Sequence, residues 1–216
     1  MNSSIAKLYL SGYHIALARN AYRKYLKETS DHPAKYQALV AIVFSAASLE
    51  AFINELTEAT LRRYSESPES IQSFANLLNE IEESRGSTRL KFQLGRATLT
   101  GKPYDKGKAP YQDFSCLLKL RDQIMHLKPQ NETEFMSVDD LADKESLKLV
   151  SCLPKNLLPD DNNPGNWIEA INTQEVAKWA CNTACEMAIS ILDALPEGRF
   201  KNEVSAGYKK SFTPEN

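Results

Sequence analysis

The stretch LLKLRDQIMHLKP, residues 117–129, places Arg121, Asp122 and His126 in an otherwise apolar helical run. Arg121 carries a planar guanidinium that can hold an anion through two parallel hydrogen bonds. His126 is of the residue type that takes up or releases a proton near neutral pH, as a general base or acid must. Asp122 precedes His126 by one helical turn, which would let its carboxylate orient the imidazole. Together these residue types can bind an anion and transfer protons next to it.

Helical geometry separates the two main candidates. At about 100° per residue, Arg121 falls within the apolar arc of its helix, and His126 lies on the polar face about 140° away. Because an unpaired buried guanidinium is costly, we expect a partner for it, and Glu50 is the obvious one, with Asn54 one turn further along. A second copy of the helix across a twofold axis would bring Arg121 and His126 together. The alternative is structural: an Arg–Glu pair, and a histidine whose positive charge suits a helix C-terminus.

Positive charge is concentrated around these residues. Of the 26 basic and 28 acidic residues, ten basic and three acidic ones lie within residues 85–128, which leaves 16 basic and 25 acidic elsewhere. Such a segment is typical of a local polyanion-binding site, even though the net charge of −2 argues against a globally basic protein. The candidate contacts to a nucleic-acid backbone are Lys102, Lys106, Lys108, Lys119 and Lys128. The alternative is that basic and acidic segments neutralise each other across the fold.

Composition excludes several other classes of protein. The four cysteines form no CxxC pair, which favours a reduced, cytoplasmic setting. None of the three histidines has metal-ligand spacing to a cysteine, so we predict no metal and no cofactor. The N-terminus lacks the pattern of a signal peptide, and the uncharged run from Tyr36 to Leu49 is too short to span a bilayer. We therefore predict no membrane contact.

The periodicity of the apolar residues predicts an all-α protein. A single helical domain is expected over residues 1–196, with an irregular acidic insertion at about 128–171 and a mobile polar tail at 197–216. Asn172 and Glu175 predict a capping box for a C-terminal helix. The helix at 34–64 is apolar nearly all round, so we expect it to be the most buried element. The predicted helices cover about 5–29, 34–64, 68–84, a short segment after 85, 110–127 and 173–195.

Three stretches resemble the HEPN superfamily, in particular RiboL-PSP-HEPN-like proteins and the HEPN ribonucleases with an R-x4–6-H motif. The stretches are SAASLEAFINEL at 45–56, LTGKPYDKGKAPYQDF at 99–114 and LKLRDQIMHLKP at 118–129. The superfamily signature is an arginine, a polar residue directly after it, and a histidine four to six residues beyond. Arg121, Asp122 and His126 fit this signature. The chain departs from the superfamily at residues 130–171, and its last helix matches only loosely.

The resemblance implies a four-helix HEPN-like bundle, an additional C-terminal helix, and a homodimer with a cleft between two copies of the fourth helix. It also implies a metal-independent endoribonuclease that cleaves RNA through its own 2′-hydroxyl group. His126 would then act as general base or acid, Arg121 would hold the scissile phosphate, and the lysines would guide the RNA backbone. A bacterial toxin or phage-defence component with a neutralising antitoxin is the implied setting. The alternative is a non-catalytic dimeric helical module that mediates interactions or binds nucleotides or RNA.

Overall fold

The computed structural model describes residues 10–27, 36–63, 68–126, 151–157 and 167–215. All regular structure in these ranges is helical, which confirms the predicted all-α class. The helices are α1 (Leu10–Tyr25), α2 (Gln37–Arg63), α3 (Glu69–Glu83), α4 (Thr88–Thr100), α5 (Tyr111–Met125), the 3-10 turn η1 (Lys155–Leu157), α7 (Trp167–Ile171), α8 (Gln174–Ala194) and α9 (Arg199–Ser211).

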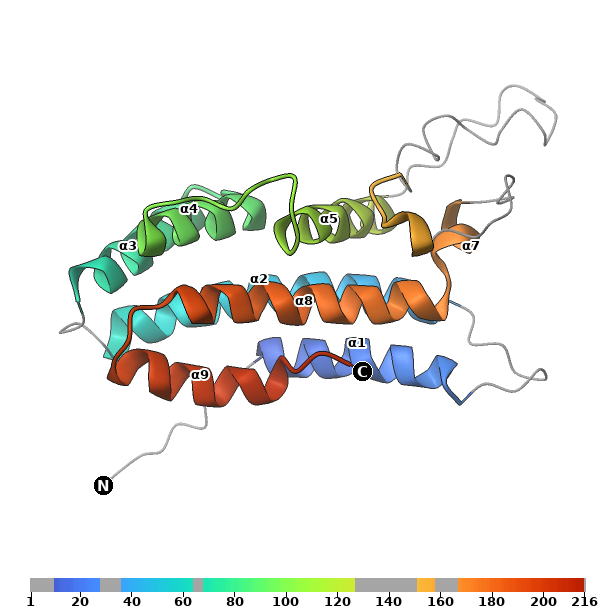
Figure 1. Ribbon diagram of the computed structural model, residues 1–216, viewed down its shortest axis with the longest axis horizontal. Helices are drawn as coiled ribbons and strands as arrows, with labels where there is room; N and C mark the ends of the chain where they lie inside the picture. Colours follow the sequence, from blue (N-terminus) through green and yellow to red (C-terminus); the bar gives the residue numbers. More distant parts are fainter. Residues whose placement is uncertain (1–9, 28–35, 64–67, 127–150, 158–166, 216) are drawn as a thin grey trace.

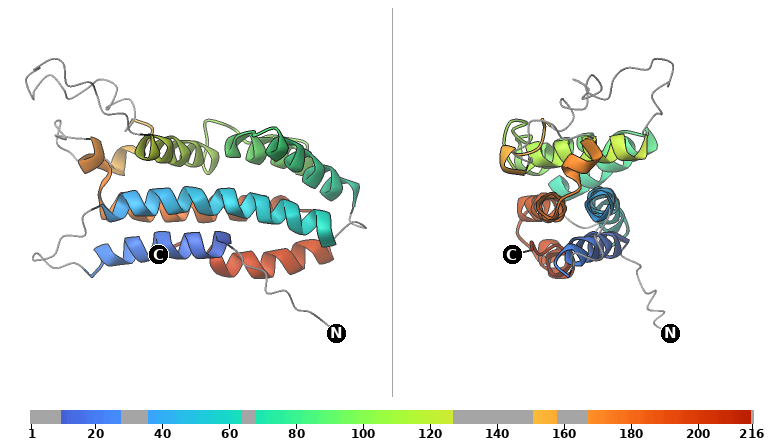
Figure 2. Two further views of the ribbon diagram at one scale, coloured as in Figure 1. Left: turned by 180° about the vertical axis from the view of Figure 1, so that it is seen from behind. Right: turned by 90° about the vertical axis from the view of Figure 1, so that its right-hand side faces the viewer.

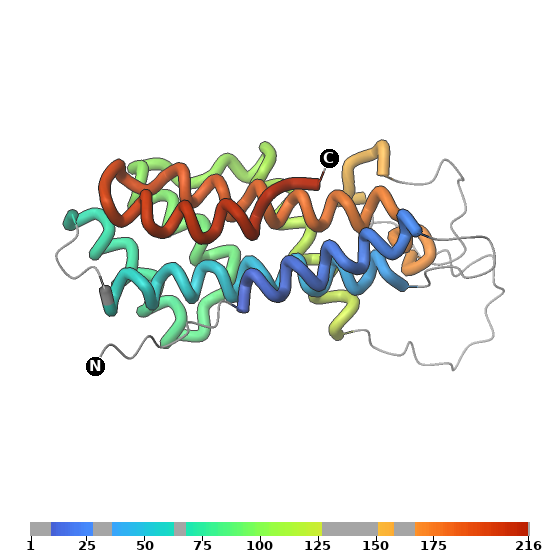
Figure 3. Tube along the Cα trace, turned by 90° about the horizontal axis from the view of Figure 1, so that it is seen from below, coloured from blue at the N-terminus to red at the C-terminus, as the bar shows by residue number. Residues whose placement is uncertain are grey.

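The helices lie in three layers along one long axis (Figures 1 and 2). Helices α2 and α8 run side by side in the middle layer, α1 and α9 form the layer below, and α3, α4 and α5 form the layer above. Viewed from below, α1 and α9 cover the middle layer one after the other (Figure 3). This arrangement places the two central helices between apolar surfaces on both sides.

The middle layer owes its position to its residue types. Helix α2 buries large apolar side chains such as Leu49, Phe52 and Leu56, and α8 buries mostly small ones such as Ala180 and Ala184. Small side chains let the two helix axes approach closely, while the large ones fill the space between layers. The prediction that the 34–64 helix would be the most buried element is therefore only partly right, because α8 shares the centre of the molecule with it.

Helix α2 also bears on the question of a membrane. By length and composition alone, residues Gln37–Arg62 could cross a bilayer, with a mean hydropathy of 1.6 in the most apolar window. Half of that window is buried inside the bundle, and a core helix meets the same criterion. The position of α2 between two layers accounts for its apolar composition.

The C-terminal region differs from the prediction of a mobile tail at 197–216. Residues 199–211 form α9, whose Phe200, Val204 and Tyr208 recur every four residues and are buried on one face. Beyond the helix, the Arg19 side chain donates a 2.6 Å hydrogen bond to the carbonyl oxygen of Ser211 and forms an ion pair with Glu215. The segment was missed because its apolar residues are sparse and only tertiary packing makes it a helix.

Two smaller expectations also change. Helix α8 is capped by Thr173, whose hydroxyl oxygen accepts a hydrogen bond from the Val176 N–H, whereas Asn172 accepts one from the Tyr25 hydroxyl. The N-cap therefore lies one residue later than predicted, and the predicted capping box does not form, because the third helical residue is Val176. The insertion at 128–171 is not wholly irregular, because η1 and α7 lie within it, and its residues 128–150 and 158–166 lie outside the described part.

Candidate active site and the adjacent lysine groove

Helix α5 carries the candidate site, and its two halves differ in burial. Its first ten residues provide the apolar contacts that hold it on the bundle, namely Tyr111, Phe114, Leu117, Leu118 and Leu120. Its C-terminal end rises to the surface, where Met125 is 58% exposed and His126 is also exposed. The apolar arc expected along the whole helix therefore stops before Ile124, which is only partly buried. Arg121 and Asp122 stand at the boundary between the two halves.

The predicted pair between Arg121 and Glu50 is confirmed. An Arg121 guanidinium nitrogen lies 3.6 Å from a carboxylate oxygen of Glu50, across the contact between α5 and α2. The Arg121 Nε lies 2.9 Å from the Asp122 carboxylate, but its N–H does not point at an acceptor, so this contact is an ion pair without a hydrogen bond. The expected apolar surroundings are wrong for Glu50, whose side chain is 48% exposed, against 27% for Arg121.

Asn54, expected beside Arg121, belongs to a different cluster. Its side-chain oxygen accepts a 2.5 Å hydrogen bond from the Lys91 ammonium group, which also pairs with Glu82. Lys91 is only 3% exposed, so these two partners compensate a buried charge between α2, α3 and α4. Sequence reasoning missed this lysine, because its position in a polar segment gave no sign of burial.

His126 ends α5 as its C-cap, with its backbone N–H donating to the Asp122 carbonyl oxygen at 3.0 Å. Its imidazole is exposed, and it makes no hydrogen bond or ion pair with another residue in the described ranges. The Asp122 carboxylate contacts Arg121 instead of the imidazole. The structure thus brings Asp122 to Arg121, while His126 stands one turn further on, accessible from solvent.

The candidate RNA-binding lysines are distributed over two elements. Lys102, Lys106 and Lys108 are exposed in the loop at 101–110, and Lys108 forms a 3.5 Å ion pair with Asp105. Lys119 is exposed on α5, and Lys128 lies outside the described residues. The basic segment therefore surrounds the start of α5 and reaches toward its exposed end.

A groove of about 560 Å³ opens beside α5, between the 101–110 loop and residues 151–155. Two of the predicted lysines, Lys106 and Lys119, line it together with Lys155, and Asp113 is the single acidic lining residue in the described ranges. The remaining lining residues are Gln112, Ser115, Cys116, Ser151, Cys152, Leu153 and Pro154. Lys155 was not among the predicted residues, because it follows an insertion whose path the sequence does not reveal.

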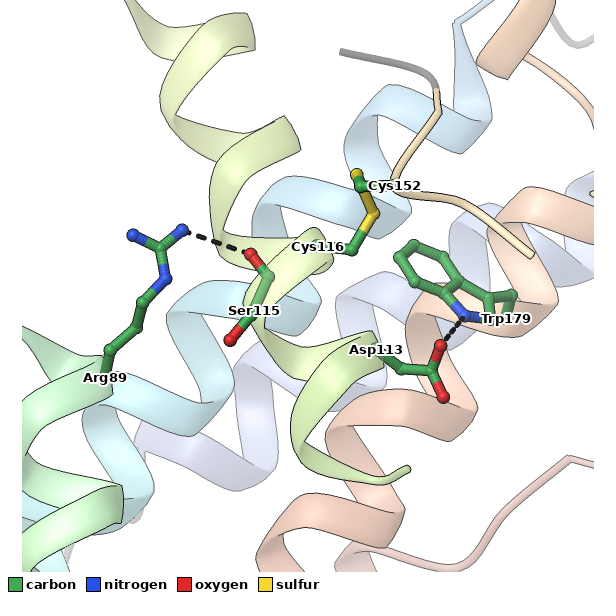
Figure 4. Close-up of a disulfide and its surroundings, with 6 residues drawn as sticks. All are labelled: Arg89, Asp113, Ser115, Cys116, Cys152 and Trp179. Atoms are coloured by element: carbon green, nitrogen blue, oxygen red, sulfur yellow. Dashed lines mark hydrogen bonds between the residues drawn. A yellow bond between two sulfur atoms is a disulfide. The ribbon is translucent and has the colours of Figure 1, made fainter. Parts of the chain in front are cut away.

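Two of the lining residues, Cys116 on α5 and Cys152, form a disulfide bond (Figure 4). The two residues are 36 positions apart in the sequence and 5.5 Å apart between their Cα atoms. Cys181 and Cys185 are buried thiols. The pairing was not predicted, and it weakens the argument for a reducing compartment, where disulfides are rare and usually transient or redox-sensing. Four cysteines allow six different single pairs, and only the tertiary structure selects one of them.

The neighbours of the disulfide fix the start of α5 from both sides. Arg89 of α4 donates a 3.1 Å hydrogen bond to the Ser115 carbonyl oxygen, and the Trp179 ring nitrogen of α8 donates to Asp113 at 3.5 Å (Figure 4). Burial, and then the charge of Asp113, raises the pKa of Glu186 on α8. The acidic side of the groove therefore faces α8, away from the exposed end of α5.

No group of three or more His, Cys, Asp or Glu side chains in the described ranges could hold a metal ion. Comparison of the chain with protein-family models, with curated proteins and with solved structures finds no match. The functional argument therefore depends on the residues themselves.

Proposed function

We propose that this protein is a metal-independent endoribonuclease built on a HEPN-like four-helix bundle. The observation that carries the proposal is the position of Arg121 and His126, which both lie at the accessible end of α5 and not in the core. The structural alternative, an ion pair for Arg121 and a helix C-terminus for His126, does not require that both side chains be accessible. Accessibility is what a large substrate such as RNA requires.

In the proposed reaction, His126 accepts the proton of the ribose 2′-hydroxyl group, and the 2′-oxygen attacks the adjacent phosphorus. The bond from phosphorus to the 5′-oxygen breaks, and that oxygen receives a proton, which leaves a 2′,3′-cyclic phosphate and a 5′-hydroxyl end. Arg121 binds the non-bridging phosphate oxygens and stabilises the negative charge that develops on them. Its partners Glu50 and Asp122 hold the guanidinium at the surface until the phosphate arrives.

A homodimer is part of this proposal, because Arg121 and His126 diverge on one helix. Met125, 58% exposed, and the half-buried Ile124 lie between the two polar residues. Apolar side chains in this position would be covered if two copies of α5 met across a twofold axis. The second copy then supplies the His126 that protonates the leaving oxygen. The cellular setting that we propose is a cytoplasmic toxin or phage-defence component neutralised by an antitoxin protein.

One observation favours a second function, a non-catalytic dimeric module that mediates interactions or binds RNA. The Arg121 guanidinium is already engaged by two carboxylates, from Glu50 and Asp122. If these contacts persist in the presence of RNA, the arginine serves the fold and no transition state is stabilised. The two functions differ in the role of the His126 side chain, which transfers protons in the ribonuclease and does not in the non-catalytic module.

The decisive experiment incubates the purified protein with single-stranded RNA in EDTA and analyses the product ends. We expect cleavage that leaves 2′,3′-cyclic phosphates, and its loss by at least about a hundredfold in His126→Ala, as for removal of a general base. Gln123→Ala, an exposed change on the same helix, is the matched control and retains activity. Cleavage that requires a divalent metal, or that survives in His126→Ala, refutes the mechanism. RNA binding without cleavage by any variant favours the second function.

A further inference from the structure

The groove beside α5 differs from the remaining basic surface in its construction. Its three lysines come from three separate segments: Lys106 from the loop before α5, Lys119 from α5 and Lys155 from η1. In the described part of the chain, no ion pair joins Lys106 or Lys155 to an acidic side chain. Three positively charged side chains therefore line one hollow, in which Asp113 is the only acidic side chain among the residues that the structure describes.

The groove leads toward His126. Gln112, Ser115 and Lys119 line it and recur at steps of three and four along α5, so they share one face of the helix. The same face continues through Asp122, and His126 follows Lys119 by seven residues, about 10 Å along the axis. An RNA strand whose phosphates bind at the lysines could therefore continue along this face to the imidazole.

The disulfide links the segment that carries Lys155 to α5. Lys155 lies three residues after Cys152, which is bound covalently to Cys116, and all three residues line the groove. The segment 151–157 contains no α-helix of its own, and its only regular element is the three-residue turn η1. Leu153 is the buried apolar anchor of this segment. Besides the disulfide, apolar packing of Leu153 and of the partly buried Leu157 holds the segment on the bundle, and the disulfide is its covalent link to α5.

We propose that this groove binds consecutive phosphates of single-stranded RNA through Lys106, Lys119 and Lys155, and that the Cys116–Cys152 disulfide makes the binding redox-dependent. The inference rests on the proposed function for its substrate class and deepens it by assigning the path of the RNA. Reduction by a dithiol transfers two electrons and two protons to the disulfide, leaves Cys116 and Cys152 as thiols, and converts the dithiol to its cyclic disulfide. Lys155 is then released from the groove, and affinity for RNA falls.

The test measures binding and cleavage separately. Binding is followed by fluorescence anisotropy with a labelled RNA in which every 2′-hydroxyl group is replaced by hydrogen, so that it cannot be cleaved. We expect Lys106→Gln, Lys119→Gln and Lys155→Gln each to weaken binding about fivefold at 0.1 M salt, and to reduce the salt dependence by about 0.7 per lost phosphate contact. Lys210→Gln, an exposed lysine on α9 in the opposite layer, is the matched control and leaves binding unchanged.

The redox arm compares wild type with Lys155→Gln, each with and without dithiothreitol. Reduction should weaken binding by wild type about as much as Lys155→Gln does, and should have no further effect on Lys155→Gln. Circular dichroism at the assay temperature confirms that the reduced protein remains helical, and Cys152→Ser should reproduce the reduced state without the reagent.

Each outcome separates this inference from the proposed function. Unchanged binding in all three lysine variants, with RNA cleavage intact, overturns the groove and leaves the ribonuclease standing. Lysine-dependent binding without cleavage supports the groove and refutes the ribonuclease. If reduction weakens RNA binding by Lys155→Gln as much as it weakens binding by wild type, the proposed redox dependence is overturned, because the disulfide then acts through the whole fold and not through Lys155. If a polyglutamate peptide binds as tightly as the labelled RNA, the assignment of the groove to RNA is overturned.

Discussion

Removing Arg121 or Glu50 shows whether their ion pair serves the fold. The closest charged atoms are 3.6 Å apart, and the side chains are 27% and 48% exposed, so solvent screens their attraction. Exposed pairs contribute about 0.2–1 kcal/mol, whereas breaking a fully buried pair costs about 3–5 kcal/mol. From the observed exposures we expect a coupling energy of about 0.5–1 kcal/mol between the two residues.

The assay is a double-mutant cycle by urea denaturation of wild type, Glu50→Ala, Arg121→Ala and the double variant. The single changes should each lower the free energy of unfolding by about 1 kcal/mol or somewhat more, because part of the Arg121 stem also packs against the bundle. The pair between Glu58 and Arg62, with side chains 48% and 75% exposed on α2, is the matched surface control. We expect about 0.3–0.5 kcal/mol for it.

A coupling energy above about 3 kcal/mol would contradict this reasoning, since it would show that the pair behaves as a buried one. Arg121 would then be a structural residue, and loss of activity in Arg121→Ala would be explained by loss of folded protein. With the smaller value, Arg121→Ala stays folded and should still lose cleavage by about a hundredfold or more, as for removal of a group that stabilises a developing charge. Arg121→Lys should also lose most activity, because it lacks the planar fork.

Three further predictions concern stability. Reducing the disulfide, or replacing Cys152 by serine, should lower the free energy of unfolding by about 3.8 kcal/mol, the value for a 36-residue loop. Urea denaturation with and without dithiothreitol measures this loss, and an unchanged free energy of unfolding would contradict the loop-closure argument. Gly95→Ala should destabilise the protein by about 1–2 kcal/mol, because the new Cβ would lie 2.8 Å from a buried aromatic ring. In the control Gly207→Ala, the new Cβ would have no atom within 4 Å, so this change should be neutral or stabilising by up to about 1 kcal/mol. Equal melting temperatures of the two variants would contradict the prediction. Burial raises the pKa of Cys181 to about 12 and that of Cys185 to about 11. Above pH 9 the folded state therefore binds more protons than the unfolded state. The free energy of unfolding then falls as pH rises, by up to about 1.4 kcal/mol per pH unit for each thiol. The double alanine variant should show a shallower fall between pH 9 and 11, and an unchanged slope would show that the thiols do not contribute.

Much of the fold could be predicted from local sequence. Helices α2, α3, α5 and α8 were found within a few residues, because each carries a long apolar stripe at helical spacing. Helix α9 was missed, since its stripe of Phe200, Val204 and Tyr208 is narrow and its surroundings are polar. Such a stripe is stable only where another surface covers it, and Phe52 of α2 supplies that surface, with ring centroids 4.9 Å from Tyr208.

The candidate site also has features that the sequence predicts and features that only the tertiary structure shows. The sequence alone determined the residue types and their spacing: Arg121 and His126 diverge on one helix because α-helical geometry fixes the angle between them, and Glu50 was identified as the partner because a charge in an apolar arc requires one. Only the tertiary structure decided how exposed that pair is, since exposure depends on which neighbouring helices cover the end of α5. It also decided that Asn54 serves Lys91, that Cys116 pairs with Cys152, and that Lys155 joins Lys106 in one groove. These contacts connect segments far apart in the chain, and no local pattern encodes distances between such segments.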